Sequence, residues 1–161
     1  MSNKVDLKNE EIYIIKRNSD MVYRLAFSQM KNNNDADDVY QEVFYRYIKR
    51  KPEFGSIEHE KAWFIRVTLN CSKTSLTSFW KTKTAQLDES IAMPETDKED
   101  LSYALKKLSK KHRAVLHLFY YEDLTTKQIA KYMHINEGNV RMLLTRARRE
   151  LKKILEKEQQ L

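Results

Sequence analysis

The sequence predicts an all-α protein made of two small helical domains, because turn residues are scarce and apolar residues recur at helical spacing. The 161 residues include only 2 Gly and 2 Pro, and a many-stranded sheet needs many more residues of these types in its turns. The scarcity of Gly also excludes Gly-rich phosphate loops and the Ser nucleophile elbow. Most familiar enzyme classes are therefore excluded, and no catalytic residue is expected.

Two segments of the first half have the three- and four-residue apolar spacing of amphipathic helices. Residues 6–31 are expected to form one interrupted helix or two consecutive helices, with the interruption near Ser19 and Asp20. Residues 58–82 are expected to form one long helix. The apolar positions of these segments that carry the pattern are Ile12, Ile15, Val22, Leu25, Ala26, Met30, Ala62, Ile65, Leu69, Leu76 and Phe79.

Between these segments, residues 35–49 predict a further helix. Asp35, Asp37 and Asp38 crowd its first turn, where carboxylates cap free amides and complement the helix dipole, and Pro52 ends it. The expected buried stripe comprises Ala36, Val39, Tyr40, Val43, Phe44, Tyr47 and Ile48.

The net charge of +7 is unevenly distributed along the chain. Residues 1–83 carry 15 basic and 11 acidic side chains, residues 84–100 carry 1 and 6, and residues 101–161 carry 14 and 6. The acidic, polar middle stretch is typical of a linker. We therefore expect domains at 1–83 and 101–161 joined by a linker at 84–100. Basic domains favour nucleic acid as a partner, although a solvated basic face is the plain alternative.

The second domain is expected to contain four helices, of which the last two form a helix-turn-helix over residues 126–145. Thr125 and Gln128 have the spacing of a capping box, and the helix that they begin should run to about Met133. A turn at residues 134–136 follows, in which His134 occupies a position that Gly usually holds and should be left-handed. Asn136 caps the last helix, which runs to about Glu156.

The helix-turn-helix has apolar residues where its two helices must pack, and polar and basic residues on the opposite face of the last helix. Such a face suits the major groove, since Arg and Asn can read base edges and further basic side chains neutralise phosphates. A solvent-facing basic helix in a bundle is the alternative. The packing residues are Ile129, Ala130, Met133, Ile135, Val140 and Leu143, and the candidate DNA-binding residues are Asn139, Arg141, Met142, Thr145, Arg146 and Arg149.

Two stretches resemble bacterial sigma factors of the extracytoplasmic-function (ECF) group. Residues 35–44, followed by Phe54 and residues 63–70, are similar to sigma region 2. The stretch from Leu105 to Leu151 is similar to region 4. The resemblance covers nearly the whole chain and implies a noncatalytic specificity subunit of RNA polymerase.

The resemblance also implies roles for individual residues. Asp35, Asp38, Gln41 and Glu42 should dock on a coiled coil of the polymerase, with ordinary helix-terminal charge as the alternative. Phe54, Trp63, Arg66, Asn70 and Lys73 should surround the opened −10 element, where rings stack on bases and an amide reads their edges; Phe54 and Trp63 are alternatively core aromatics. Lys61, Lys81 and Lys83 would add phosphate-facing charge, and Thr74 and Thr77 depart from the family pattern. The last helix should read the −35 element.

The expected partners are core RNA polymerase and promoter DNA, and an anti-sigma factor is a further candidate. The single Cys71 cannot form an internal disulfide, and the histidines have no zinc-ligand spacing, so no metal and no cofactor are expected. Without a segment apolar enough for a membrane span or a signal peptide, a cytoplasmic location is expected. The competing functions are a helix-turn-helix regulator that binds duplex DNA without joining the polymerase and a metal-dependent enzyme using the carboxylates of residues 35–42.

Overall fold

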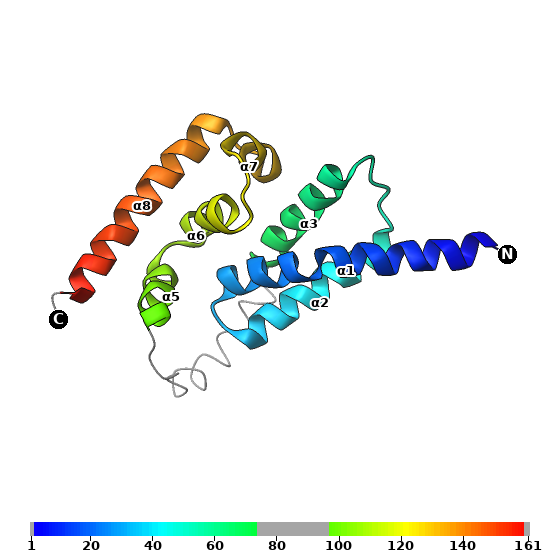
Figure 1. Cartoon of the computed structure of the whole chain (residues 1–161), viewed down its shortest axis with the longest axis horizontal. Helices are drawn as coiled ribbons and strands as arrows, with labels where there is room; N and C mark the ends of the chain where they lie inside the picture. The colour runs from blue at the N-terminus through cyan, green and yellow to red at the C-terminus, as the bar shows by residue number, and fades with distance from the viewer. Residues whose placement is uncertain (1, 74–96, 160–161) are drawn as a thin grey trace. The chain divides into compact units, whose positions relative to one another are not determined.

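The all-α prediction is confirmed. A computed structural model describes residues 2–73 and 97–159, and within these ranges every regular element is helical (Figure 1). The chain divides into two compact units, Met1–Ser78 and Phe79–Leu161, called here the first and second units. Each is described by itself.

The first unit contains α1 (Ser2–Met30), α2 (Asn33–Arg50) and α3 (Ile57–Cys71), and each of these helices packs against the other two. Burial of apolar side chains from all three helices supplies most of the driving force for folding. Apolar side chains that are at most 1% exposed are Val22, Leu25, Ala26, Met30, Ala36, Val39, Val43, Phe64, Ile65 and Cys71.

Helix α1 is continuous, so the predicted interruption near Ser19 is wrong. The Ser19 hydroxyl donates a 2.8 Å hydrogen bond to the Ile15 carbonyl, which keeps this polar residue within the helix. The predicted burial of Ile12 is also wrong, because its side chain is 44% exposed and Ile14 is buried instead. Ile14 lies one helical turn before the buried Asn18 and shares its face.

Helix α2 begins two residues earlier than predicted, and its cap is Asn32 rather than an aspartate. The Asn32 side chain accepts a 2.8 Å hydrogen bond from the backbone N–H of Asp35. At the other end, Lys51 is left-handed with φ 46° and donates its N–H to the Tyr47 carbonyl, directly before Pro52. Ile48, predicted to be buried, is 50% exposed, since it lies about 100° around the helix from the buried Tyr47.

Helix α3 ends at Cys71, whereas the sequence predicted a helix to residue 82. The Ser72 hydroxyl donates to the Thr68 carbonyl at 2.8 Å, and the Lys73 N–H donates to the Asn70 carbonyl at 3.1 Å. The second bond spans only three residues and tightens the backbone into a turn. The rest of the predicted helix, with Leu76 and Phe79, lies outside the described residues.

The second unit contains α5 (Asp97–Lys107), α6 (Lys110–Leu116), a π-helical turn η1 (His117–Tyr121), α7 (Thr126–Met133) and α8 (Glu137–Gln159). Helix α5 begins at Asp97, within the stretch expected to be linker, and residues 84–96 of that stretch lie outside the described residues. The buried Arg113 guanidinium donates to the Leu108 and Lys106 carbonyls and so satisfies the end of α5. Burial lowers the pKa of Arg113.

The local geometry of the helix-turn-helix agrees with the prediction. The backbone N–H of Gln128 donates to the Thr125 hydroxyl at 3.1 Å, and the Thr125 N–H donates to the Gln128 side chain at 2.9 Å, which completes the capping box. His134 is left-handed, with φ 57° and ψ 41°. Asn136 accepts a 2.7 Å hydrogen bond from the Asn139 N–H and starts α8. These contacts orient α8 relative to α7.

Candidate nucleic-acid interface

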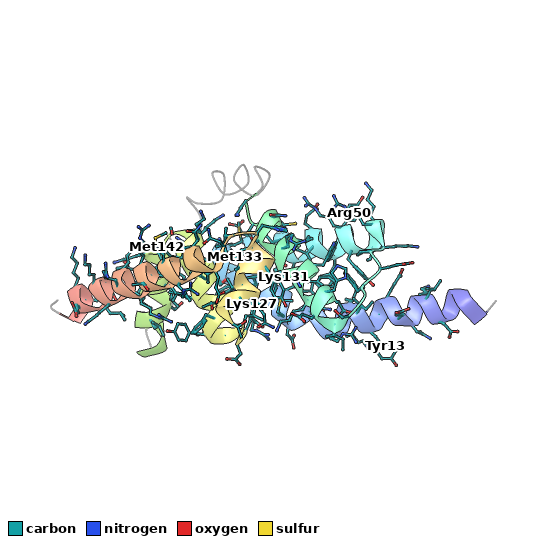
Figure 2. All side chains as sticks on the ribbon, turned by 90° about the horizontal axis from the view of Figure 1, so that it is seen from above. Tyr13, Arg50, Lys127, Lys131, Met133 and Met142 are labelled. Atoms are coloured by element: carbon teal, nitrogen blue, oxygen red, sulfur yellow. The ribbon has the colours of Figure 1, made fainter. Side chains whose placement is uncertain are left out.

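The outward face of α8 carries all the residues that the sequence proposed for the major groove. Val140, Leu144 and Ala147 are at most 2% exposed and hold the opposite face of the helix in the core. Figure 2 labels Met142 on α8, and its side chain is 42% exposed. The exposed residues of this face are Asn139, Arg141, Met142, Thr145, Arg146 and Arg149.

The basic residues of α8 differ in how they are held. Arg141 forms a 3.2 Å ion pair with Glu137 one turn before it. Arg148 donates to the Tyr120 hydroxyl at 2.7 Å and lies 5.5 Å from the Phe119 and Tyr120 ring centroids, so it is directed toward η1. Arg141 therefore stays on the exposed face, where Glu137 holds it, whereas Arg148 is directed away from that face.

Two exposed lysines on α7 were not among the residues that the sequence analysis selected. Lys127 and Lys131 are one turn apart on the first helix of the motif (Figure 2). In a helix-turn-helix the first helix crosses the DNA backbone, so their charge suits phosphates. The sequence could have indicated these lysines, because their four-residue spacing places them on one face of α7, with the buried Ile129 and Ala130 between them in the sequence.

Phe54 and Trp63 lie together at the edge of an aromatic cluster in the first unit. Their ring centroids are 6.0 Å apart, and each is half-buried. Tyr47 from α2 and Phe64 from α3 pack against both rings, at centroid distances of 5.0–6.3 Å. Both alternatives for these residues thus have a structural basis, because the rings contribute to packing and keep an exposed edge.

The polar residues proposed for the −10 element lie along α3 and just after it. Asn70 and Lys73 are exposed, whereas Arg66 is half-buried and its Nε is a buried nitrogen without a hydrogen-bond partner among the described residues. Trp63 and Asn70 are seven residues apart and so share one side of α3. The ring of Trp63, the guanidinium of Arg66 and the amide of Asn70 thus all lie on α3. Lys61 is half-buried, and Lys81 and Lys83 lie outside the described residues.

The four residues proposed for polymerase docking do not form one surface. Asp35 is 4% exposed and accepts a 2.8 Å hydrogen bond from the Asn32 side chain, so it belongs to the start of α2 and is unavailable to a partner. Asp38 and Gln41 are exposed, and Glu42 forms a 3.0 Å ion pair with Arg46. The pKa of Asp38 is raised, chiefly by burial and to a lesser extent by the charges of Asp35 and Asp37.

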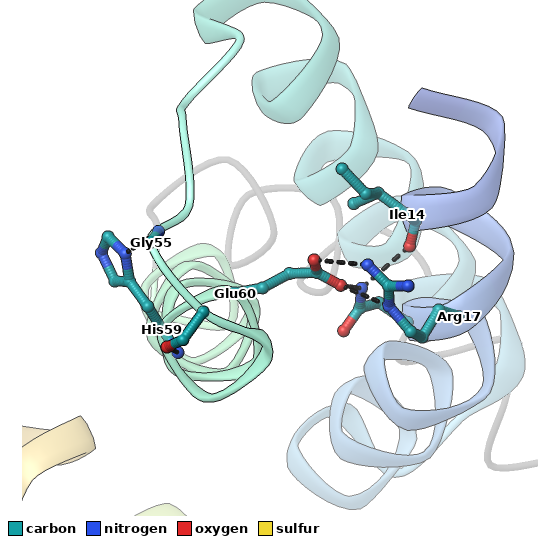
Figure 3. A network of polar contacts seen from close by, with 7 residues as sticks. Ile14, Arg17, Gly55, His59 and Glu60 are labelled. Atoms are coloured by element: carbon teal, nitrogen blue, oxygen red, sulfur yellow. Dashed lines mark hydrogen bonds and ion pairs between the residues drawn. The ribbon is translucent and has the colours of Figure 1, made fainter. Parts of the chain in front are cut away.

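A buried polar network between α1 and α3 was not predicted (Figure 3). Glu60 is 4% exposed and accepts hydrogen bonds from Arg17 Nε at 2.8 Å, Arg17 Nη2 at 2.7 Å and Asn18 Nδ2 at 2.7 Å. Burial alone would raise the pKa of Glu60, but the hydrogen bonds from Arg17 and Asn18 outweigh it and lower the pKa. Because the partners are more than 40 residues apart in sequence, no local pattern indicates this network.

The described residues contain no group of three or more His, Cys, Asp or Glu side chains arranged to hold a metal ion. Over the same residues, no helix is both long and apolar enough to cross a membrane.

A helix-turn-helix with an exposed basic second helix defines a DNA-binding protein, and comparisons with known proteins specify the class. The family model for Sigma-70 region 2 matches residues 14–82, and that for Sigma-70, region 4 matches residues 104–153. The chain is 31% identical to the RNA polymerase sigma factor SigV of Bacillus subtilis, over 84% of this chain and 85% of that protein. It is also 31% identical to the ECF RNA polymerase sigma factor SigM of the same organism, over 89% and 92%.

The chain therefore belongs to the ECF family of RNA polymerase sigma factors, and it directs promoter-specific transcription. Sigma factors are DNA-recognition subunits rather than catalytic enzymes. A solved structure of the sigma factor RpoE from Bartonella quintana, in complex with the anti-sigma factor NepR, has the same fold, with a TM-score of 0.66 and 20% identity over 94% of this chain and 97% of that one.

Proposed function

We propose that the chain joins core RNA polymerase through the first unit, opens the −10 element there, and reads the −35 element with α8. Residues 1–83 would form the domain for docking and melting, the acidic stretch between residue 83 and α5 the linker, and α5 to α8 the −35 domain. The observation that carries the −35 role is the exposed polar face of α8, whose opposite face is buried through Val140, Leu144 and Ala147. The chain would act in the cytoplasm as a noncatalytic subunit.

In the −35 complex, α8 enters the major groove and α7 crosses the DNA backbone. Arg146 and Arg149 are candidates for paired hydrogen bonds to guanine, and Asn139 for paired bonds to adenine. Lys127 and Lys131 neutralise phosphates. Loss of a base contact relaxes the preference at one base pair, whereas loss of a phosphate contact weakens all sequences alike.

In the −10 complex, the exposed edges of Phe54 and Trp63 offer a surface on which an unpaired base stacks, and Asn70 hydrogen-bonds a base edge. Arg66 and Lys73 supply positive charge for the single strand. Stacking and hydrogen bonds of this kind offset the few kcal/mol that removing a base from the duplex costs.

Docking on the polymerase uses Asp38, Gln41 and Glu42, whose exposed parts lie on adjacent turns of α2. A carboxylate-rich surface repels DNA and suits a basic protein partner. Asp35 is left out of this surface because it is buried at the start of the helix.

The test is transcription of a genomic library by core polymerase plus this protein, repeated with Arg146→Ala and Asn70→Ala. We expect promoter-specific transcripts with the wild-type chain, a changed −35 preference with Arg146→Ala, and reduced permanganate reactivity of unpaired thymines with Asn70→Ala. Lys157→Ala, at the exposed end of α8, is the control and should leave both readouts unchanged. Tight binding of the isolated chain to duplex promoters, without stimulation of core polymerase, would instead indicate a regulator.

A further inference from the structure

An open pocket of about 340 Å³ lies between α1 and α2 in the first unit. Its lining comes from two adjacent turns of α1 and from one residue of α2. The lining residues are Ser19, Asp20, Tyr23, Arg24 and Tyr40. None of these is needed for the DNA contacts proposed above.

The aromatic walls of the pocket are held in place by the fold. The Tyr40 hydroxyl donates to the Ser19 hydroxyl at 3.0 Å, and the Tyr40 ring packs against Phe44 with centroids 4.8 Å apart. The Tyr23 ring meets Tyr40 edge to face at 6.0 Å, and its hydroxyl donates to the Asn33 side chain at 3.2 Å. Both rings are only half-buried, so the pocket presents preformed aromatic surface to solvent.

The charge around the pocket favours a cation. Asp20 contributes an exposed carboxylate, and the exposed carboxylate of Asp37 lies one turn before Tyr40 on α2. Arg24, the one basic residue of the lining, already has an interaction partner within the protein. A carboxylate beside two aromatic rings matches a guanidinium, which forms charge-assisted hydrogen bonds and stacks on ring faces.

The pocket adjoins the proposed docking surface. Asp37 lies one turn before both Tyr40 and Gln41 and is exposed, so it connects the pocket to the surface formed by Asp38 and Gln41 on α2. A partner helix lying on Asp37, Asp38 and Gln41 would bring its side chains to this opening.

We propose that the pocket between α1 and α2 receives an arginine side chain of core RNA polymerase, with Asp20 pairing its guanidinium and Tyr23 and Tyr40 packing against it. This rests on the proposal that the first unit docks on the polymerase. It makes α1 a second element of that interface and identifies the partner surface as basic.

The experiment measures the Kd of the full chain for core polymerase at several salt concentrations. Asp20→Asn and Tyr23→Leu should each raise the Kd about three- to tenfold, and Tyr23→Phe, which keeps the ring, should bind within about twofold of wild type. Asp20→Asn should also flatten the dependence of the Kd on salt. Asp6→Asn, the same charge change at an exposed position earlier in α1, is the control and should bind as wild type does.

The double variant Asp38→Ala with Gln41→Ala separates this inference from the docking proposal. If the double variant binds weakly while Asp20→Asn and Tyr23→Leu bind as wild type does, the pocket inference is overturned and the docking proposal stands. If only the pocket variants bind weakly, the inference stands and the α2 face is not the docking surface. Wild-type binding by all of them overturns both.

Discussion

In the second unit, the residues proposed to face DNA lie on the solvent side of α8 and contribute little to the core, whereas in the first unit Phe54 and Trp63 belong to the cluster that packs α2 against α3. The units also differ in their polar contacts. Both units have short-range helix caps such as Thr125 with Gln128, but the first also contains the buried network at Glu60, whereas the distant pair His112–Glu150 of the second unit is partly exposed. Stability and DNA recognition should thus be separable in the second unit and coupled in the first.

The largest expected effect is loss of the buried network. Glu60→Ala removes the acceptor of three hydrogen bonds and leaves the buried Asn18 with one fewer partner, which should lower the free energy of unfolding by about 2 to 3 kcal/mol. Urea unfolding measures the loss, and amide hydrogen exchange should locate it in α1 and α3.

The matched control for Glu60→Ala lies in the second unit. Glu150 pairs with His112 at 2.9 Å, but its side chain is 45% exposed, so Glu150→Ala should cost less than about 1 kcal/mol. Equal losses for the two variants would contradict the contrast between buried and exposed polar contacts.

Trp63→Ala tests the coupling of packing and DNA opening. Removing this half-buried ring from its contacts with Tyr47 and Phe64 should lower the free energy of unfolding by about 2 kcal/mol, and it should also slow promoter opening. Thermal unfolding and permanganate footprinting measure the two effects. Trp63→Phe should retain most of both.

Arg146→Ala is the comparison for Trp63→Ala. Because Arg146 is exposed, its loss should change the free energy of unfolding by less than about 0.5 kcal/mol while reducing use of the −35 element. A large loss of stability would show that α8 couples recognition to packing as the first unit does.

A smaller loss of stability than that of Trp63→Ala is expected from the capping box. Thr125→Ala removes the acceptor for the Gln128 N–H and should destabilise the second unit by about 1 kcal/mol. Hydrogen exchange in the first turn of α7 measures this, and Thr125→Ser, which keeps the hydroxyl, should behave as wild type does. Faster exchange spread evenly through both units would contradict a local role.

The last prediction concerns how the free energy of unfolding depends on pH. The folded-state pKa of Glu60 lies below its ordinary value of 4.5, so the unfolded state binds more protons once the pH falls to that value. The contribution of Glu60 to stability is fully present above this range and is lost as the pH falls through the folded pKa. The difference in unfolding free energy between wild type and Glu60→Gln should therefore shrink as the pH is lowered from 7 to 3. A constant difference would contradict the ionised pair.

The sequence by itself determined the helical class, the resemblance to sigma factors and the local geometry of the helix-turn-helix. Thr125, Gln128, His134 and Asn136 act within a few residues of their partners, so their roles follow from spacing alone. The buried and exposed faces of α8 followed from its helical period in the same way.

Only the tertiary structure decided which residues of the first unit are buried and with what. Ile14 is buried while Ile12 is exposed, and Asp35 is buried while Asp38 is exposed, because burial depends on where neighbouring helices lie. The Glu60 network joins residues more than 40 positions apart, and the pocket at Tyr40 exists only because α1 and α2 meet there. Such contacts depend on helix packing, which the period of one helix does not encode.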